Sequence, residues 1–160
     1  MSLTFGFPSC SPDFTISLHG VDAFRSKLWC DRDAFGEVKP LKKQGPKPAI
    51  AGTIPPIVTQ STDYARLFMS ARPLMLFCVG ILIFGTEFCV GIFDRGVTFS
   101  PAYNMFQDTA ETFIRVVRRL ACNLYIHELG FNPTVLTDME LRSSLGTQGV
   151  PTRCGAIQWQ

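Results

Sequence analysis

Two acidic residues and a lysine in the first quarter of the chain have the types and the spacing for metal chemistry. Asp13 follows Pro12, and Glu37 is separated from Lys39 by Val38 alone. Both places fall in predicted β-strands, where successive side chains point to opposite faces. Glu37 and Lys39 therefore share a face, while Val38 enters the core. From a neighbouring strand, Asp13 could join Glu37 and supply the oxygen ligands that Mg²⁺ binds.

Two polar side chains on a predicted helix extend this pattern. Gln60 and Tyr64 stand four positions apart and therefore share a helix face. The order Pro-Asp, Glu-x-Lys and Gln-x₃-Tyr resembles the PD-(D/E)xK nuclease superfamily and its exonuclease branch. The resemblance implies a restriction-endonuclease-like fold, Mg²⁺ or Mn²⁺ held by Asp13 and Glu37, and nucleic acid as the substrate. It also implies that Lys39 positions or deprotonates the metal-bound water that attacks a phosphodiester.

The same residues have a purely structural interpretation. Asp13 can cap a turn, and Lys39 can end its strand in solvent. Gln60 and Tyr64 can be ordinary residues of a helix surface, because short motifs are hypotheses until their structural context is known. Only a short segment precedes Asp13, so we expect the leading helix of active members to be absent or clipped. We therefore expect a degenerate site that serves binding or regulation.

The composition indicates a globular protein of a reducing compartment. Hydrophobic residues make up 46% and charged residues 18% of the 160 positions, which is too apolar for a disordered chain. A net charge of +2 gives no reason by itself to expect a nucleic-acid partner. The six cysteines include no Cys-x-x-Cys pair, which argues against a zinc or redox motif. Since the first residues do not resemble a secretory signal, we expect an intracellular protein, cytoplasmic or nuclear.

One apolar run, Pro73 to Phe93, has the length of a membrane span, about 20 residues. A span is the alternative to a hairpin, which we favour because the run is rich in Val, Ile, Phe and Cys. Gly85–Thr86 suits a two-residue hairpin turn. We therefore expect no membrane partner. The predicted strands are Leu74–Phe84, Glu87–Phe93 and, after a turn at Asp94–Gly96, Val97–Ser100, with Ile83 opposite Phe88 and Leu82 opposite Cys89.

The rest of the chain supplies the other elements of an α/β domain. Asp108, with Glu111 three residues later, gives the capping signal of the last helix, and Gly130 gives its stop. The apolar stripe of that helix consists of Phe113, Ile114, Val117, Leu120, Ala121 and Leu124. The remaining predicted elements are a strand at Pro12–His19, a loop or short helix at Val21–Trp29, a strand at Ala34–Lys39, an exposed loop at Pro40–Pro56 and a helix at Ile57–Ala71; residues 142–160 form a poorly ordered tail.

Two groups of basic residues have two interpretations each. Lysines of the proline-rich loop can touch a phosphate backbone, and arginines of the last helix can contact an anionic partner. Such residues more often belong to a solvated surface, which we expect here because the net charge is near zero. The groups are Lys42, Lys43 and Lys47, and Arg115, Arg118 and Arg119.

Four short motifs occur in a fixed order from the middle of the chain onward. They are Tyr-Ala-Arg at 64–66, Ser-Ala-Arg-Pro at 70–73, Ile-Phe-Asp-Arg-Gly-Val at 92–97 and Glu-Leu-Gly-Phe-Asn-Pro-Thr at 128–134. In order and spacing they resemble fungal-type protein kinases over residues 34–136, although the family often has one more residue between Arg95 and Gly96. The motif residues are Arg66, Arg72, Pro73, Asp94, Arg95, Gly96, Gly130 and Pro133.

The resemblance does not extend to kinase chemistry. Phosphoryl transfer needs a glycine-rich loop, a strand lysine, a base aspartate and a metal-binding aspartate. The sequence has no Gly-x-Gly-x-x-Gly, His-Arg-Asp or Asp-Phe-Gly, and in the family these motifs lie nearer the C-terminus. We therefore expect a non-catalytic N-terminal module or fragment without a cofactor, which interacts with the kinase catalytic lobes in cis or in trans. Its expected fold is one α/β domain over residues 1–141, a small mixed sheet with a β-meander flanked by two helices.

Overall fold

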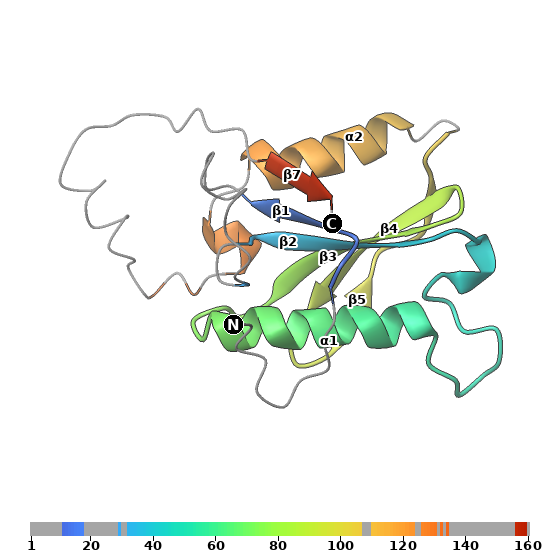
Figure 1. The fold of residues 1–160 in the computed structure, drawn as a ribbon, viewed down its shortest axis with the longest axis horizontal. Helices are drawn as coiled ribbons and strands as arrows, with labels where there is room; N and C mark the ends of the chain where they lie inside the picture. The colour runs from blue at the N-terminus through green and yellow to red at the C-terminus, as the bar shows by residue number, and fades with distance from the viewer. Residues whose placement is uncertain are drawn as a thin grey trace.

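The computed structural model describes residues 11–17, 29, 32–106, 110–123, 126–130, 132, 134 and 156–159. In this part of the chain, a mixed β-sheet carries helix α1 (Pro56–Ala71) on one face and helix α2 (Ala110–Arg118) on the other (Figure 1). The three layers confirm the predicted α/β fold, a small mixed sheet with a β-meander flanked by two helices.

The described strands lie in the order β5-β4-β3-β2-β1-β7, and β6 pairs with β4. Strands β2 and β3 are parallel, whereas the other pairs are antiparallel. A parallel pair requires a crossover connection, which α1 provides here. The strands are β1 (Phe14–Ser17), β2 (Ala34–Lys39), β3 (Cys78–Phe84), β4 (Glu87–Phe93), β5 (Val97–Phe99), β6 (Tyr103–Asn104) and β7 (Ala156–Trp159).

Alternation along the strands divides the sheet into two apolar faces. We call them the α1 face and the α2 face after the helix that covers each. The α2 face carries Phe14, Ile16, Ala34, Val79, Ile81 and Phe88. The α1 face carries Phe35, Cys78, Leu82, Phe84, Cys89 and Phe93, which pack with residues of α1 such as Ile57, Tyr64 and Phe68.

Helix α1 confirms the predicted helix at Ile57–Ala71 and begins one residue earlier, at Pro56. Proline fits the first helical position because its missing N–H would have no partner inside the helix. At the other end, Arg72 leaves helical geometry and its backbone N–H donates to the carbonyl oxygen of Met69. The apolar stripe of α1 is buried against the sheet, which fixes the crossover between β2 and β3.

The hairpin of β3 and β4 has the predicted register, with Ile83 opposite Phe88 and Leu82 opposite Cys89. Gly85 adopts a φ of +63° in the turn, a left-handed conformation that glycine tolerates. The prediction was wrong at the start of β3, which begins at Cys78 and not at Leu74. The backbone N–H of Leu76 donates instead to the carbonyl oxygen of Gly130 at 2.6 Å, so this segment pairs outside the sheet.

The apolar run Pro73–Phe93 is therefore largely hairpin. Among the described residues, no helix combines the length and the apolar character that crossing a membrane requires. The other predicted strands are also present, since Ala34–Lys39 matches β2, Val97–Ser100 contains β5 and Pro12–His19 contains β1.

The last helix is shorter than predicted. Helix α2 ends at Arg118 and is followed by a π-helical turn, η4 (Arg119–Asn123), and a 3₁₀ turn, η5 (Ile126–Leu129). Four residues of the predicted apolar stripe nevertheless pack in the core: Phe113, Val117, Leu120 and Ala121. Ile114, predicted within that stripe, is 63% exposed, because it shares a helix face with the exposed Arg118.

Residues 156–159, which we predicted within a poorly ordered tail, form strand β7. They pair antiparallel with β1, with Ala156 opposite Ser17 and Trp159 opposite Phe14. The pairing covers the backbone groups that β1 would otherwise expose at the sheet edge. Several other predictions lie outside the described residues: those for 18–28, Asp108, Leu124 and the rest of 142–160.

Candidate functional site

Glu37 lies at the centre of a polar group on the α1 face. Its side chain is 4% exposed, and Lys39, two residues along β2, places its Nζ atom 2.6 Å from Oε1. Tyr64, on α1, donates its hydroxyl proton toward Oε2 of Glu37 at 3.1 Å and toward the carbonyl oxygen of Ser11 at 2.9 Å. A phenol has one proton, so the two acceptors share it. Strand alternation thus places Glu37 and Lys39 together, as the spacing predicted.

Asp13 lies beside this group without joining it. Phe14 pairs with Gly36, so Asp13, which directly precedes β1, lies at the level of Glu37. Its Oδ2 atom accepts a hydrogen bond of 2.7 Å from the backbone N–H of Val38. The carboxylate therefore extends the pairing of β1 and β2 by one further bond. Gln60 is exposed on α1, one turn before Tyr64.

The residues of this group do not fit a bound Mg²⁺ or Mn²⁺. Glu37 is already compensated by the Lys39 ammonium, and Asp13 accepts from the backbone. A divalent cation of this kind prefers about six oxygen ligands in near-octahedral geometry. Within the described part of the chain, no three or more side chains of His, Cys, Asp and Glu form a group that could hold a metal. The arrangement is an ion pair within β2 whose carboxylate accepts a hydrogen bond from Tyr64, and this bond connects α1 to β2.

A buried ion pair attaches the C-terminal end of α1 to the start of β2. Nη1 of Arg72 lies 3.2 Å from Oδ1 of Asp33, with side-chain exposures of 5% and 1%. The guanidinium also lies over the Phe68 ring, 5.7 Å from its centroid. Arg72 directly follows α1 and Asp33 directly precedes β2, so the pair joins these two elements. Sequence reasoning named Arg72 as a motif residue but missed Asp33.

Three further motif residues, Asp94, Gly96 and Gly130, have local structural roles. Oδ1 of Asp94 accepts from the backbone N–H of Gly96 at 2.8 Å, which closes the turn between β4 and β5. Gly130 has a φ of +105°, and a Cβ atom there would lie 1.8 Å from the carbonyl oxygen of Phe77. Only glycine fits this close approach between η5 and the segment before β3.

The remaining motif residues lie at the surface or outside the described residues. Arg66 is exposed on α1, where its Nη1 atom lies 3.5 Å from Oδ1 of Asp63. Arg95 and Pro73 are exposed as well. Pro133 lies outside the described part of the chain. Of the three motif arginines, Arg66 and Arg95 are thus exposed, whereas Arg72 is buried.

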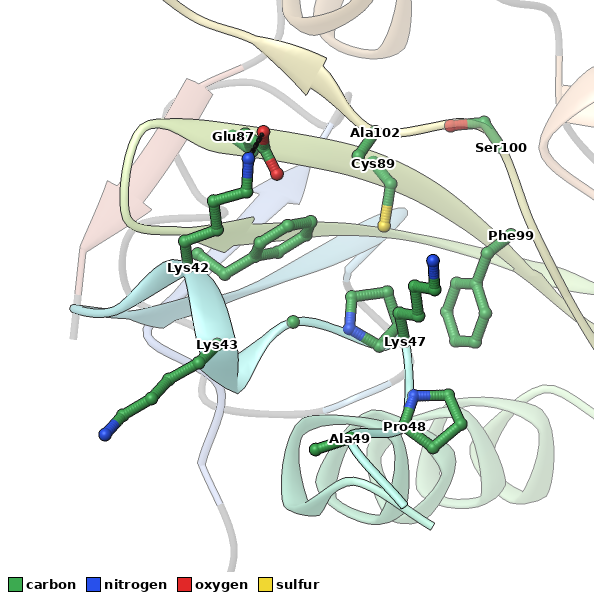
Figure 2. Close-up of a pocket in the computed structure, with 13 residues that line it drawn as sticks. Lys42, Lys43, Lys47, Pro48, Ala49, Glu87, Cys89, Phe99, Ser100 and Ala102 are labelled. Atoms are coloured by element: carbon green, nitrogen blue, oxygen red, sulfur yellow. Dashed lines mark ion pairs between the residues drawn. The ribbon is translucent and has the colours of Figure 1, made fainter. Parts of the chain in front are cut away.

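A pocket of about 770 Å³ lies on the α1 face of the sheet, between the loop after β2 and strands β3 to β5 (Figure 2). The loop, which includes the 3₁₀ turn η3 (Lys42–Gln44), was predicted as exposed, and most of its residues are. The pocket itself was not predicted. Its formation depends on the loop folding back, where Gly45 packs so closely that a Cβ atom would lie 2.7 Å from the Phe84 ring.

A comparison with protein families agrees with the family resemblance that the order of the motifs indicated. The model of the family described as fungal protein kinase matches residues 25–152. This range contains both ion pairs, the hairpin and all of the motif residues. No curated protein and no solved structure gives a significant match.

Proposed function

The chain belongs to the fungal protein kinase family, and we propose that it is a non-catalytic module of such a kinase that acts by binding another protein. The partner that the family suggests is a pair of kinase catalytic lobes, in cis or in trans. The sequence itself supports the non-catalytic part, since it has no Gly-x-Gly-x-x-Gly, His-Arg-Asp or Asp-Phe-Gly for phosphoryl transfer.

The proposal rests on a contrast between two groups of family-motif residues, those with a structural role and those exposed at the surface. Arg72, Asp94 and Gly130 each have a structural role in the α/β fold. Arg66 and Arg95, in contrast, expose their guanidinium groups at the surface. An exposed arginine that belongs to a family pattern is better explained by recognition of another molecule than by stability.

Binding to a kinase catalytic region of this family tests the proposal. We expect the wild-type chain to bind in isothermal titration calorimetry. The double variant Arg66→Ala/Arg95→Ala should bind about tenfold more weakly, which corresponds to about 1.4 kcal/mol. The matched control, Arg115→Ala/Arg118→Ala, removes the same charge from the exposed side of α2 and should bind as the wild type does. Absence of binding, or equal loss in both double variants, would contradict the proposal.

A metal-dependent nuclease is the second candidate, and one observation favours it. Glu37, Lys39 and Tyr64 do converge, with Asp13 beside them. Thermal unfolding with and without Mn²⁺ decides between the two. We expect no change in Tm, because Lys39 compensates Glu37. A rise that disappears in Glu37→Gln, together with metal-dependent cleavage of DNA, would favour the nuclease, because a ligand that binds only the folded state stabilises it.

A further inference from the structure

The pocket in Figure 2 has the dimensions of a small-molecule site. Its volume of about 770 Å³ lies within the range of about 300–1,000 Å³ that is typical of ligand pockets. The loop residues on one side, Lys42 to Ala49, face β3, β4 and β5 on the other. The pocket is separate from the Glu37 group, since neither Glu37 nor Lys39 lines it.

The inner wall of the pocket is apolar. Phe84 and Cys89 are buried, and Phe99 completes this wall from the edge strand β5. Burial raises the pKa of the Cys89 thiol to about 11, so this side chain behaves as a neutral apolar group at physiological pH. A hydrocarbon chain or an aromatic ring is therefore the chemistry that this wall accommodates.

The rim of the pocket is cationic. Three lysines line it, Lys42, Lys43 and Lys47, against a single carboxylate, Glu87. Lys42 and Glu87 form an ion pair and so compensate each other. Figure 2 shows the Lys47 side chain directed up across the pocket, on the same side as the Phe99 ring, whereas the Lys43 side chain points away from it. Lys47 is thus the rim lysine that faces the apolar wall, and no carboxylate of the described residues forms an ion pair with it.

Contacts within the loop that carries the lysines order its first part. Pro46 and Pro48 restrict its backbone, and the N–H of Gly45 donates to the carbonyl oxygen of Lys42 at 3.1 Å. The Gln44 side chain also accepts from the backbone N–H of Leu41 at 3.0 Å. A preformed wall reduces the ordering cost of binding.

From these observations we infer that the pocket binds a small amphipathic carboxylate, with its apolar body against Phe84, Cys89 and Phe99 and its carboxylate at Lys47. Among the described residues, Lys47 is the cation that faces the pocket, so a head group with a single negative charge is sufficient. The inference does not depend on the kinase partner, because Arg66 and Arg95 do not line the pocket.

Calorimetric titration with decanoate tests the inference, with two comparison ligands. Acetate has the head group without the chain, and decyltrimethylammonium has the chain with the opposite charge. We expect decanoate to bind and both others to bind at least about tenfold more weakly, because each lacks one of the two interactions. Equal binding of the two amphiphiles, or equal binding of acetate and decanoate, would overturn the inference.

A pair of lysine variants locates the site. Lys47→Gln should weaken decanoate binding about tenfold, whereas Lys43→Gln, with the same loss of charge in the same loop, should change it by less than about twofold. The amide NMR signals of Gly45, Phe99 and Ser100 should shift in the wild type when decanoate is added. Equal loss of binding in both variants, or signals that shift only elsewhere in the chain, would show that decanoate does not bind in this pocket.

Discussion

The two faces of the sheet attach their helices in different ways. On the α1 face, the Asp33–Arg72 ion pair and the Tyr64–Glu37–Lys39 group connect α1 to β2 through buried polar contacts. On the α2 face, α2 packs through Phe113, Val116 and Val117, and none of its nine residues is buried. Directional bonds allow one position for α1, whereas the half-buried apolar contacts of α2 tolerate small shifts. We expect the two faces to respond very differently to substitution.

The largest effect is expected from breaking the Asp33–Arg72 pair. Arg72→Ala leaves Asp33 buried with its main compensating charge removed, which costs about 3–5 kcal/mol of unfolding free energy. Urea unfolding measures the loss. Arg66→Ala, at an exposed pair on the same helix, is the control and should cost less than about 1 kcal/mol.

If Arg72→Ala does not fold, the double variant Asp33→Asn/Arg72→Met keeps the prediction testable. Removing both charges should restore much of the stability, because the cost lies in burying the carboxylate without the Arg72 charge and not in the missing bond. Equal instability of Arg72→Ala and Arg66→Ala would mean that the buried pair does not anchor α1.

The next largest effect compares phenylalanines of the two helices. Phe68, on α1, is 0% exposed, and Phe68→Ala should cost about 3–5 kcal/mol. Phe113, on α2, is half-buried with its ring centroid 5.0 Å from that of Phe88. Phe113→Ala should cost about 1–2 kcal/mol, since less apolar surface is lost from the core. Denaturant unfolding of the two variants, side by side, checks the order, and a reversed order would contradict the comparison.

A smaller effect concerns two tyrosine hydroxyls. Tyr64→Phe removes the hydroxyl that reaches Glu37 and should cost about 1 kcal/mol. Tyr103→Phe is the matched change on the α2 face, where the Tyr103 ring packs against Phe88 at 5.7 Å. It should leave the unfolding free energy within about 0.5 kcal/mol of the wild type. Thermal unfolding measures both, and equal changes in Tm would show that the polar group adds nothing to the attachment of α1.

The smallest effect is a dependence of stability on alkaline pH. Burial raises the pKa of Cys78 from 9.0 to about 12 and that of Cys89 to about 11, and both thiols lie on the α1 face. Below pH 9.0 each thiol is protonated in both states and adds no pH dependence. Between pH 9.0 and 11 the unfolded chain releases these protons first, so the unfolding free energy falls as pH rises.

Unfolding curves recorded between pH 7 and about pH 10.5 check this dependence. Cys89→Ala should flatten the alkaline decline, whereas Cys122→Ala should not, since Cys122 is half-buried on the α2 face. A decline of the same slope in the wild type and in both variants would mean that other groups cause it.

The sequence predicts the neighbours within one element far better than the neighbours between elements. Strand alternation correctly placed Glu37 beside Lys39, and apolar content with a Gly–Thr turn gave the register of β3 and β4. Spacing alone does not tell whether a carboxylate and an ammonium pair with each other or share a metal. The structure shows that they pair, an arrangement that neither interpretation of the sequence included.

The elements that sequence reasoning missed depend on contacts between distant segments. Asp33 is 39 positions from Arg72, and nothing local marks it as the partner of a helix-ending arginine. Strand β7 forms against β1, at the opposite end of the chain. A cationic residue at the end of an apolar helix was the available signal, because a buried arginine requires a nearby acidic group.

The pairing of β1 with β7 also sets the order in which the chain can fold. The β3–β4 hairpin joins neighbouring residues and can form within about 1–10 μs. The β1–β7 pair joins residues 14–17 to residues 156–159, so it closes a loop that contains nearly the whole chain. During synthesis, β1 leaves the ribosome before β7, so its outer edge stays unpaired until residues 156–159 have emerged as well. For that interval β1 has an open edge, and we expect nascent chains to be most prone to aggregation then.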